Sequence, residues 1–180
     1  MKLSEIDALE NILRIWTRKI PYIRDMHYWD RLDTMKMSSI QRRHERYMII
    51  YTWQIIENKV ANNGSVKEIW TKHKGRKVEI PTPKGSPHTK TLRNNAFTVR
   101  GGNLFNSCPS EIRNYTGNDC STLGFKNLLQ VYLKAIPDRP RDPIGQHWPE
   151  ATTLDGKPSN SLIDWQRKLQ VQIKANEWKF

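Results

Sequence analysis

The pattern of apolar and polar positions in residues 38–57, SSIQRRHERYMIIYTWQIIE, predicts the helix around which the chain is organised. Ser38 and Gln41 have the spacing of a capping box at a helix N-terminus. One face repeats at helical spacing and consists of Ile40, His44, Tyr47, Met48, Tyr51 and Ile55. The second half is apolar nearly all round, so we expect other elements to bury it.

Four other stretches are predicted to be helices, namely residues 4–20, 26–35, 121–136 and 159–180. Apolar residues repeat at helical spacing in the first, the third and the last, and the second has the pattern of a short helix. Ser4 can cap the first, and Pro21 and Pro137 end the first and third. The last either docks on the core or stays a separate tail.

The pattern between residues 58 and 109 is weaker. Residues 66–70 and 78–80 are short apolar runs that suit a two-stranded ribbon, and prolines follow them. Residues 91–109 predict a loop, because Gly101 and Gly102 interrupt their apolar positions and each costs about 1 kcal/mol in a helix relative to alanine.

The predicted fold class is therefore mainly α, an irregular bundle of four to five helices with a small β-ribbon in the basic central stretch. We expect one helical domain over residues 1–136 with a basic loop at 58–95. A proline-rich linker at 137–158, which holds five of the ten prolines, and a helix or tail at 159–180 follow.

The net charge of +12 is concentrated in one segment of the chain, and this bears on function. Residues 58–100 hold ten lysines and arginines against two acidic residues, whereas the segments on either side each carry only a small excess. Such a patch favours a polyanionic partner, first nucleic acid and second an acidic membrane surface.

The residues that we expect to contact phosphates lie on the central helix and in the basic stretch. They are Arg42, Arg43, Arg46, Lys72, Lys74, Arg76, Lys77, Lys90, Arg93 and Arg100. Two alternatives stay open: the basic stretch is only a solvated loop, or the helix arginines pair with Asp30, Asp33 and Glu45. Aromatic residues beside cations can stack on bases, but for Trp53 and Tyr47 core packing is the favoured role.

Little else in the sequence points to chemistry. The two cysteines, Cys108 and Cys120, do not provide the ligands of a zinc site, and they indicate a reducing compartment, nuclear or cytoplasmic. No apolar run reaches the roughly 18 residues that span a membrane, and the acidic N-terminus argues against a signal peptide. We expect no cofactor, no bound metal and no catalytic residue.

Several segments, taken in order, give a long match to one family. They are L-E-x-I-L-R-x-W-T-R-K-I from Leu9, W-x-R-L from Trp29, S-I-Q-R-R-x-E-R-Y-x-I-I-Y-x-W-x-I-x-E from Ser39, L-R-x-x-x-F-x-V-R-x-x-N-L-F-N-x-x-P-x-x-I-R from Leu92, F-K-x-x-L-x-x-Y-L from Phe125 and S-N-S-L-x-D-W from Ser159. Over roughly residues 5–165 the chain resembles the region after the polymerase core of non-LTR (LINE-type) retrotransposon reverse transcriptases. Gly101, Gly102 and Cys108 depart from the family's usual apolar residues.

The resemblance implies a thumb-like helical segment that holds template and product duplex, an RNA–DNA hybrid, next to the polymerase core of its parent. The parent would be an RNA-directed DNA polymerase. Polymerisation requires carboxylates that hold two metal ions, and this chain has no adjacent acidic pair, so we expect no polymerase activity from it alone.

Two other functions remain as alternatives. The first is a transposon-derived remnant that acts only as a structural or protein-interaction domain. The second is a small nuclease that uses His44 with Glu45, or His73.

Overall fold

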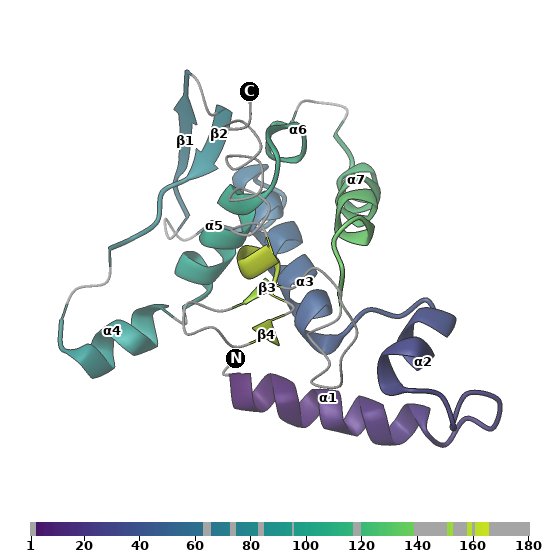
Figure 1. Ribbon diagram of the computed structural model, residues 1–180. Coiled ribbons are helices and arrows are strands. Elements are labelled where there is room, and N and C mark those ends of the chain that lie inside the picture. Colours follow the sequence, from purple (N-terminus) through teal and green to yellow (C-terminus); the bar gives the residue numbers. More distant parts are fainter. Residues whose placement is uncertain are drawn as a thin grey trace, which may run out of the picture. The chain divides into compact units, whose positions relative to one another are not determined.

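The computed structural model describes residues 3–62, 66–72, 75–82, 85–94, 96–116, 120–138, 151–152, 158–159 and 161–165. Its helices and strands are, in chain order, α1 (Leu3–Thr17), α2 (Tyr28–Thr34), α3 (Ile40–Ile56), β1 (Glu68–Thr71), β2 (Gly75–Val78), α4 (Pro87–Asn94), α5 (Phe97–Ser107), α6 (Ser110–Arg113), α7 (Thr122–Lys134), β3 (Ala151–Thr152) and β4 (Pro158–Ser159) (Figure 1). Helices dominate, and β1 and β2 form a small antiparallel ribbon, so the predicted fold class is confirmed.

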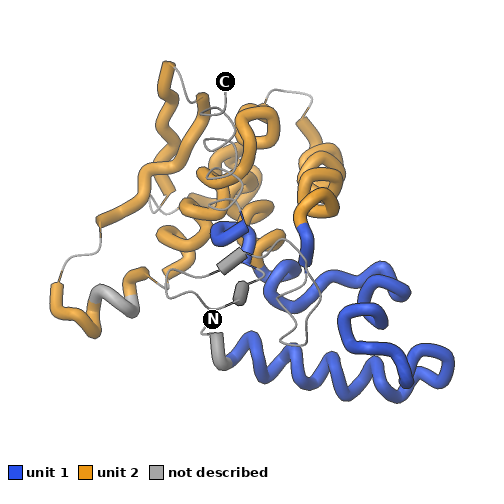
Figure 2. The backbone as a smooth tube through the Cα atoms, in the orientation of Figure 1, with its two compact units in different colours: residues 1–44, 137–180 blue, residues 45–136 orange. Residues whose placement is uncertain are grey.

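The chain divides into two compact units, which are described separately. Unit 1 consists of residues 1–44 and 137–180, and unit 2 of residues 45–136 (Figure 2). The boundary falls inside α3. No helix of the described residues is long and apolar enough to cross a membrane.

In unit 1 a buried carboxylate connects the first three helices. Glu10 of α1 accepts hydrogen bonds from the Tyr28 hydroxyl of α2 and, at 2.7 Å, from the backbone N–H of Ile40 at the start of α3. Burial, followed by the hydrogen bond to Glu10, raises the pKa of Tyr28. The predicted helices at residues 4–20 and 26–35 are confirmed by α1 and α2.

Helix α3 begins one residue later than the sequence predicted. The hydroxyl of Ser39, not that of Ser38, accepts the hydrogen bond from the backbone N–H of Arg42, at 3.0 Å. Asp138 in turn accepts hydrogen bonds from the backbone N–H and the hydroxyl of Ser39. The start of the predicted linker is therefore bound to α3. Most of residues 139–180, where the rest of the linker and the last helix were expected, lie outside the described residues.

In unit 2 the second half of α3 supplies the core. Trp53 is fully buried, stacks on Phe125 of α7 with ring centroids 4.4 Å apart, and donates from Nε1 to the carbonyl of Tyr115 at 2.8 Å. The predicted burial is only partly correct, because Tyr47 is 61% and Tyr51 44% exposed. One side of α3 thus remains open to solvent.

Helix α7 forms as its sequence predicted. The apolar positions Phe125, Leu129 and Leu133 recur at helical spacing and are buried. Ser121 caps the helix, since its hydroxyl accepts a hydrogen bond from the backbone N–H of Gly124 at 2.9 Å.

Helix α5 occupies a stretch that was predicted to be a loop, and that prediction was wrong. Gly101 and Gly102 are buried inside the helix. A Cβ atom on Gly101 would lie 2.7 Å from the hydroxyl oxygen of Thr52 in α3, and one on Gly102 would lie 2.6 Å from Ile80 Cδ1. The glycines therefore let α5 approach α3 and the chain after β2 closely, and this packing offsets their low helix propensity.

Candidate nucleic-acid interface

The basic stretch forms a hairpin ribbon, as the sequence predicted, but its second strand is Gly75–Val78 and begins three residues before the predicted strand at 78–80. In its antiparallel register Glu68 pairs with Val78, Ile69 with Lys77, Trp70 with Arg76 and Thr71 with Gly75. Gly75 has a φ of 64°, which glycine adopts without strain. The side chains on β1 are exposed along its whole length, whereas β2 buries Arg76 and Val78.

Side chains from α5 and the residues around α6 hold β2. The amide of Asn106 pairs with the backbone of Val78, accepting from its N–H at 2.8 Å and donating to its carbonyl at 2.7 Å. Asn114 accepts from the N–H of Arg76 at 3.0 Å, and Arg113 donates to the Arg76 carbonyl. These bonds satisfy β2's backbone as a neighbouring strand would, so the ribbon is fixed to the helices.

Arg76 lies inside this support. Its side chain is 2% exposed and forms ion pairs with Glu57, just after α3, and with Glu68 on β1. The sequence suggested Arg76 as a phosphate ligand, but in this position it ties the ribbon to α3. Its second partner, Glu68, is one of the two acidic residues of the basic stretch.

Four lysines of unit 2 lie in the ribbon or close to it in sequence. Lys67 and Lys72 flank β1 and are exposed, Lys77 on β2 is half-buried, and Lys59 precedes the ribbon with its ammonium 5.6 Å from the Trp53 ring centroid. Trp70 on β1 is 59% exposed. The sequence pattern did not single out Lys59 and Lys67, although both contribute to the local charge excess that identified the patch.

The arginines of α3 have three different environments. Arg42 is 2% exposed, pairs with Asp138 and donates to the carbonyl of Pro137 at 2.9 Å. Arg43 is half-buried and donates to the carbonyl of Ser38, and half-buried Arg46 lies over the Tyr47 ring. Arg42 is therefore a structural residue of unit 1, and its ion pair with Asp138 was not among the pairings that we expected.

Burial raises the pKa of Asp138, although the Arg42 guanidinium and the Ser39 donors oppose this effect.

The remaining candidates follow the ribbon. Arg93 is exposed on α4, and Arg100 is half-buried on α5. Lys74 lies outside the described residues, as does the side chain of Lys90.

Nothing in the described part of the chain groups three or more histidine, cysteine, aspartate or glutamate side chains around a potential metal site. Cys108 and Cys120 are both free thiols. Burial raises the pKa of the Cys108 thiol to about 12, and the charge of Arg113 only partly opposes this effect. His73, one candidate of the nuclease alternative, lies outside the described residues, and His44 is half-buried on α3.

Comparisons of the chain with protein-family models, with curated proteins and with solved structures gave no match.

Proposed function

We propose that this chain is a noncatalytic nucleic-acid-binding domain that grips a template–product duplex, an RNA–DNA hybrid, through its phosphates. The observation that carries the proposal is the orientation of charge on the ribbon: Arg76 is locked inward while Lys67 and Lys72 are exposed. The ribbon thus presents ammonium groups on a support that its helices hold in place.

Electrostatics favours such a partner. Lysines that neutralise phosphates release condensed counterions, and this supplies most of the sequence-independent affinity for a duplex. The basic stretch has two acidic residues, Glu68 and Glu79. Glu68 forms an internal ion pair with Arg76, so Glu79 is the one outside this pairing. The local field therefore stays strongly positive where the lysines are exposed.

The resemblance to the region after the polymerase core of non-LTR reverse transcriptases supports the same proposal. On this view the parent is an RNA-directed DNA polymerase of a transposable element, and the chain holds the duplex next to its polymerase core, in the nucleus or the cytoplasm. The departures at Gly101 and Gly102 have a packing reason in this chain, because both glycines are buried against neighbouring elements.

The proposal is tested by the salt dependence of binding to a labelled RNA–DNA hybrid. The test variant replaces Lys67, Lys72 and Lys77 by glutamine. A control variant with the same reduction in charge replaces Arg18, Lys19 and Arg24, which are exposed in unit 1. We expect the slope of log K against log salt to shrink by up to about 0.9 for each lysine–phosphate pair that the test variant removes. The control variant should keep the slope of the unsubstituted chain.

Equal slopes for the two variants would mean that only net charge matters, and the ribbon would not be the interface. If the unsubstituted chain is folded and yet binds no hybrid at low salt, the proposal is overturned.

A second candidate is a protein-interaction domain, favoured by one specific observation. Helix α1 exposes large apolar side chains, namely Leu9, Ile12, Ile15 and Trp16. Exposed apolar rows of this kind mark protein-binding surfaces. A pull-down of the parent's polymerase core that is abolished in Ile12→Gln/Trp16→Gln, with hybrid binding unchanged, would support it.

A further inference from the structure

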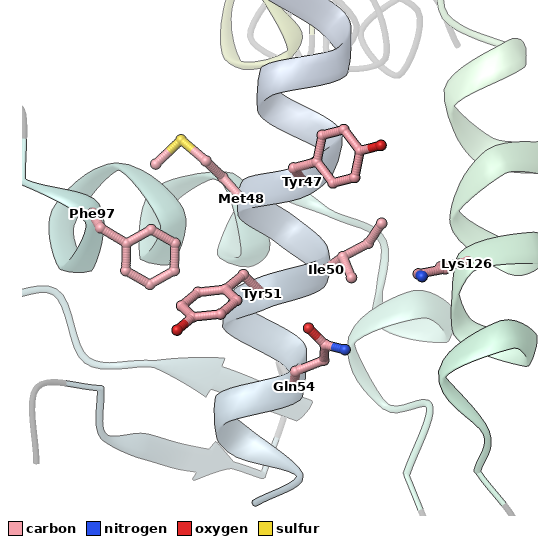
Figure 3. Close-up of a pocket in the computed structure, with 7 residues that line it drawn as sticks. All are labelled: Tyr47, Met48, Ile50, Tyr51, Gln54, Phe97 and Lys126. Carbon is pink, nitrogen blue, oxygen red and sulfur yellow. The ribbon is translucent and has the colours of Figure 1, made fainter. Parts of the chain in front are cut away.

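A groove runs along the side of α3 that remains open. Its volume is about 420 Å³, and its lining residues are Tyr47, Met48, Ile50, Tyr51, Gln54, Phe97 and Lys126. Figure 3 shows α3 between the two other contributors, with Phe97 of α5 on one side and Lys126 of α7 on the other. All of these residues belong to unit 2.

The floor of the groove is aromatic and accessible. Tyr47 and Tyr51 lie one helical turn apart on α3, and both are substantially exposed. The rings of Tyr51 and Phe97 meet edge to face with centroids 5.2 Å apart. Exposed rings offer π-faces on which a planar group can stack, and every nucleobase has such a face.

The lining carries positive charge and no negative charge. Lys126 contributes an ammonium group and Gln54 an amide, and none of the seven lining residues is acidic. Arg46 adds a further cation at the edge, with its guanidinium 5.9 Å from the centroid of the Tyr47 ring. A ligand that combines a flat apolar part with a negative charge is complementary to this lining.

We propose that the groove binds unpaired nucleotides of a strand that extends from the gripped duplex, with bases stacked on Tyr47, Tyr51 and Phe97 and a phosphate near Lys126. This inference rests on the proposed function and deepens it, because it assigns a single-stranded segment to a second site in the same unit. The groove lies at the lower end of the roughly 300–1,000 Å³ typical of small-ligand sites, which suits one or two nucleotides better than a duplex.

An acidic peptide would also meet Lys126, but the lining favours a nucleic acid. Peptide-binding helical grooves hold a row of aliphatic anchors in deep apolar pockets. Among the seven lining residues Met48 and Ile50 are buried, and the large apolar side chains that are exposed are those of Tyr47 and Tyr51. Ring stacking with a nearby cation is the recognition mode of single-stranded nucleic acid.

The test compares three probes: a blunt RNA–DNA hybrid, the same hybrid with a ten-nucleotide single-stranded extension, and the extension alone. Binding is measured with the full chain and with Tyr47→Leu/Tyr51→Leu, which keeps apolar surface but removes the stacking rings. Lys126→Gln is a milder second variant, and Tyr22→Leu is the matched control, since Tyr22 is an almost fully exposed tyrosine outside the groove. Circular dichroism and thermal melting check that each variant folds.

We expect the extension to raise the affinity of the unsubstituted chain for the hybrid. The double tyrosine variant should lose about fivefold or more of that gain in affinity. Lys126→Gln should lose a smaller part, Tyr22→Leu none, and the affinity for the blunt hybrid should stay within about twofold throughout. Photocrosslinking from 5-iodouridine in the extension should label residues of α3 in the groove.

Two results would overturn the proposal that the groove binds unpaired nucleotides, while leaving the duplex proposal intact. The first is that the extension adds no affinity, and the second is that the added affinity persists in every groove variant. Binding of the isolated extension that depends on the tyrosines, without any binding of the blunt hybrid, would support the groove and overturn the duplex grip. If the folded chain binds none of the three probes, both the duplex proposal and the groove proposal are overturned. Saturable, tyrosine-dependent binding of an acidic peptide would then identify a peptide, and not a nucleic acid, as the occupant of the groove.

Discussion

Asp138 accepts two hydrogen bonds from Ser39, one from its backbone N–H and one from its hydroxyl, each at 2.7 Å, although 99 residues separate the two in sequence. The same hydroxyl accepts a hydrogen bond from the backbone N–H of Arg42 at 3.0 Å. One side chain therefore both caps α3 and connects its first turn to the segment that follows α7. This joins two parts of unit 1 that lie far apart in the chain.

Ser39→Ala should consequently lower the free energy of unfolding by about 2 kcal/mol, since it removes a helix cap and a hydrogen bond to a carboxylate. The matched control is Ser38→Ala, which deletes the neighbouring hydroxyl that the sequence suggested as the cap and should change stability by less than about 0.5 kcal/mol. Urea denaturation measures both. Equal losses of stability in the two variants would show that the cap is not at Ser39.

The glycine pair of α5 gives a second prediction with an internal comparison. Gly101→Ala should destabilise by about 1–3 kcal/mol, because its Cβ meets Thr52 Oγ1 at 2.7 Å and this hydroxyl is buried and bonded to the Met48 carbonyl. Gly102→Ala should be much milder, because its Cβ meets the movable end of Ile80 and alanine is the better helix former by about 1 kcal/mol.

Two double variants test that explanation. Thr52→Ala should reduce the cost of Gly101→Ala, and Ile80→Val should make Gly102→Ala stabilising, because each removes the atom that the new methyl group would meet. The readout is again the free energy of unfolding. Additive effects in both pairs would disprove the steric origin of the glycine requirement.

The contrast between α7 and α5 shows how far the sequence predicts this fold. Helix α7 has an apolar face that repeats without interruption and a capping serine, so its own residues determine it. Helix α5 depends on the close approach of Thr52 in α3 and Ile80 in the chain after β2. Local propensity holds no information on such partners, and the loop prediction for residues 91–109 failed for that reason.

The candidate interface divides in a similar way. Charge counting located the basic stretch, and two short apolar runs predicted a ribbon within it, because both patterns are properties of consecutive residues. It could not separate Arg76 from Lys72, since burial of Arg76 depends on Glu57 and on the fold around it. The same holds for Arg42, whose partner Asp138 is remote in sequence. A basic residue is available to bind phosphate only if it does not form a buried ion pair with a carboxylate of the same chain.

Arg76 therefore yields a third prediction, in which stability and binding separate. Arg76→Gln should lower the free energy of unfolding by about 3 kcal/mol, because it leaves the largely buried carboxylate of Glu57 without its partner. Lys72→Gln on the same ribbon should change stability by less than about 0.5 kcal/mol and weaken hybrid binding.

The double variant Arg76→Gln/Glu57→Gln should be less destabilised than the sum of its single variants, since the largely buried charge of Glu57 is then removed as well and only the more exposed carboxylate of Glu68 loses its partner. Where Arg76→Gln is folded, its salt slope for hybrid binding should equal that of the parent. A reduced slope would mean that Arg76 does reach a phosphate.

The buried thiol of Cys108 gives a prediction about pH. Its pKa of about 12 in the folded chain lies above the ordinary value of 9.0, so the unfolded chain loses this proton first as pH rises. Stability from the buried neutral thiol is therefore fully present below about pH 9 and is lost progressively towards about pH 12. The free energy of unfolding of the parent should fall relative to that of Cys108→Ala as pH rises from about 9 to 11.

Thiol reactivity tests the same burial at a milder pH. The thiolate is the reactive form, and its fraction at about pH 8 falls about tenfold for each unit by which the pKa rises. In a Cys120→Ser variant, which leaves Cys108 as the only thiol, iodoacetamide should react on the order of 1,000-fold more slowly with the native chain than with the urea-unfolded chain. In the reciprocal Cys108→Ser variant the half-buried Cys120 should react far more readily in the native state. Comparable native rates for the two thiols would show that Cys108 is not shielded by the packing of α5 against its neighbours.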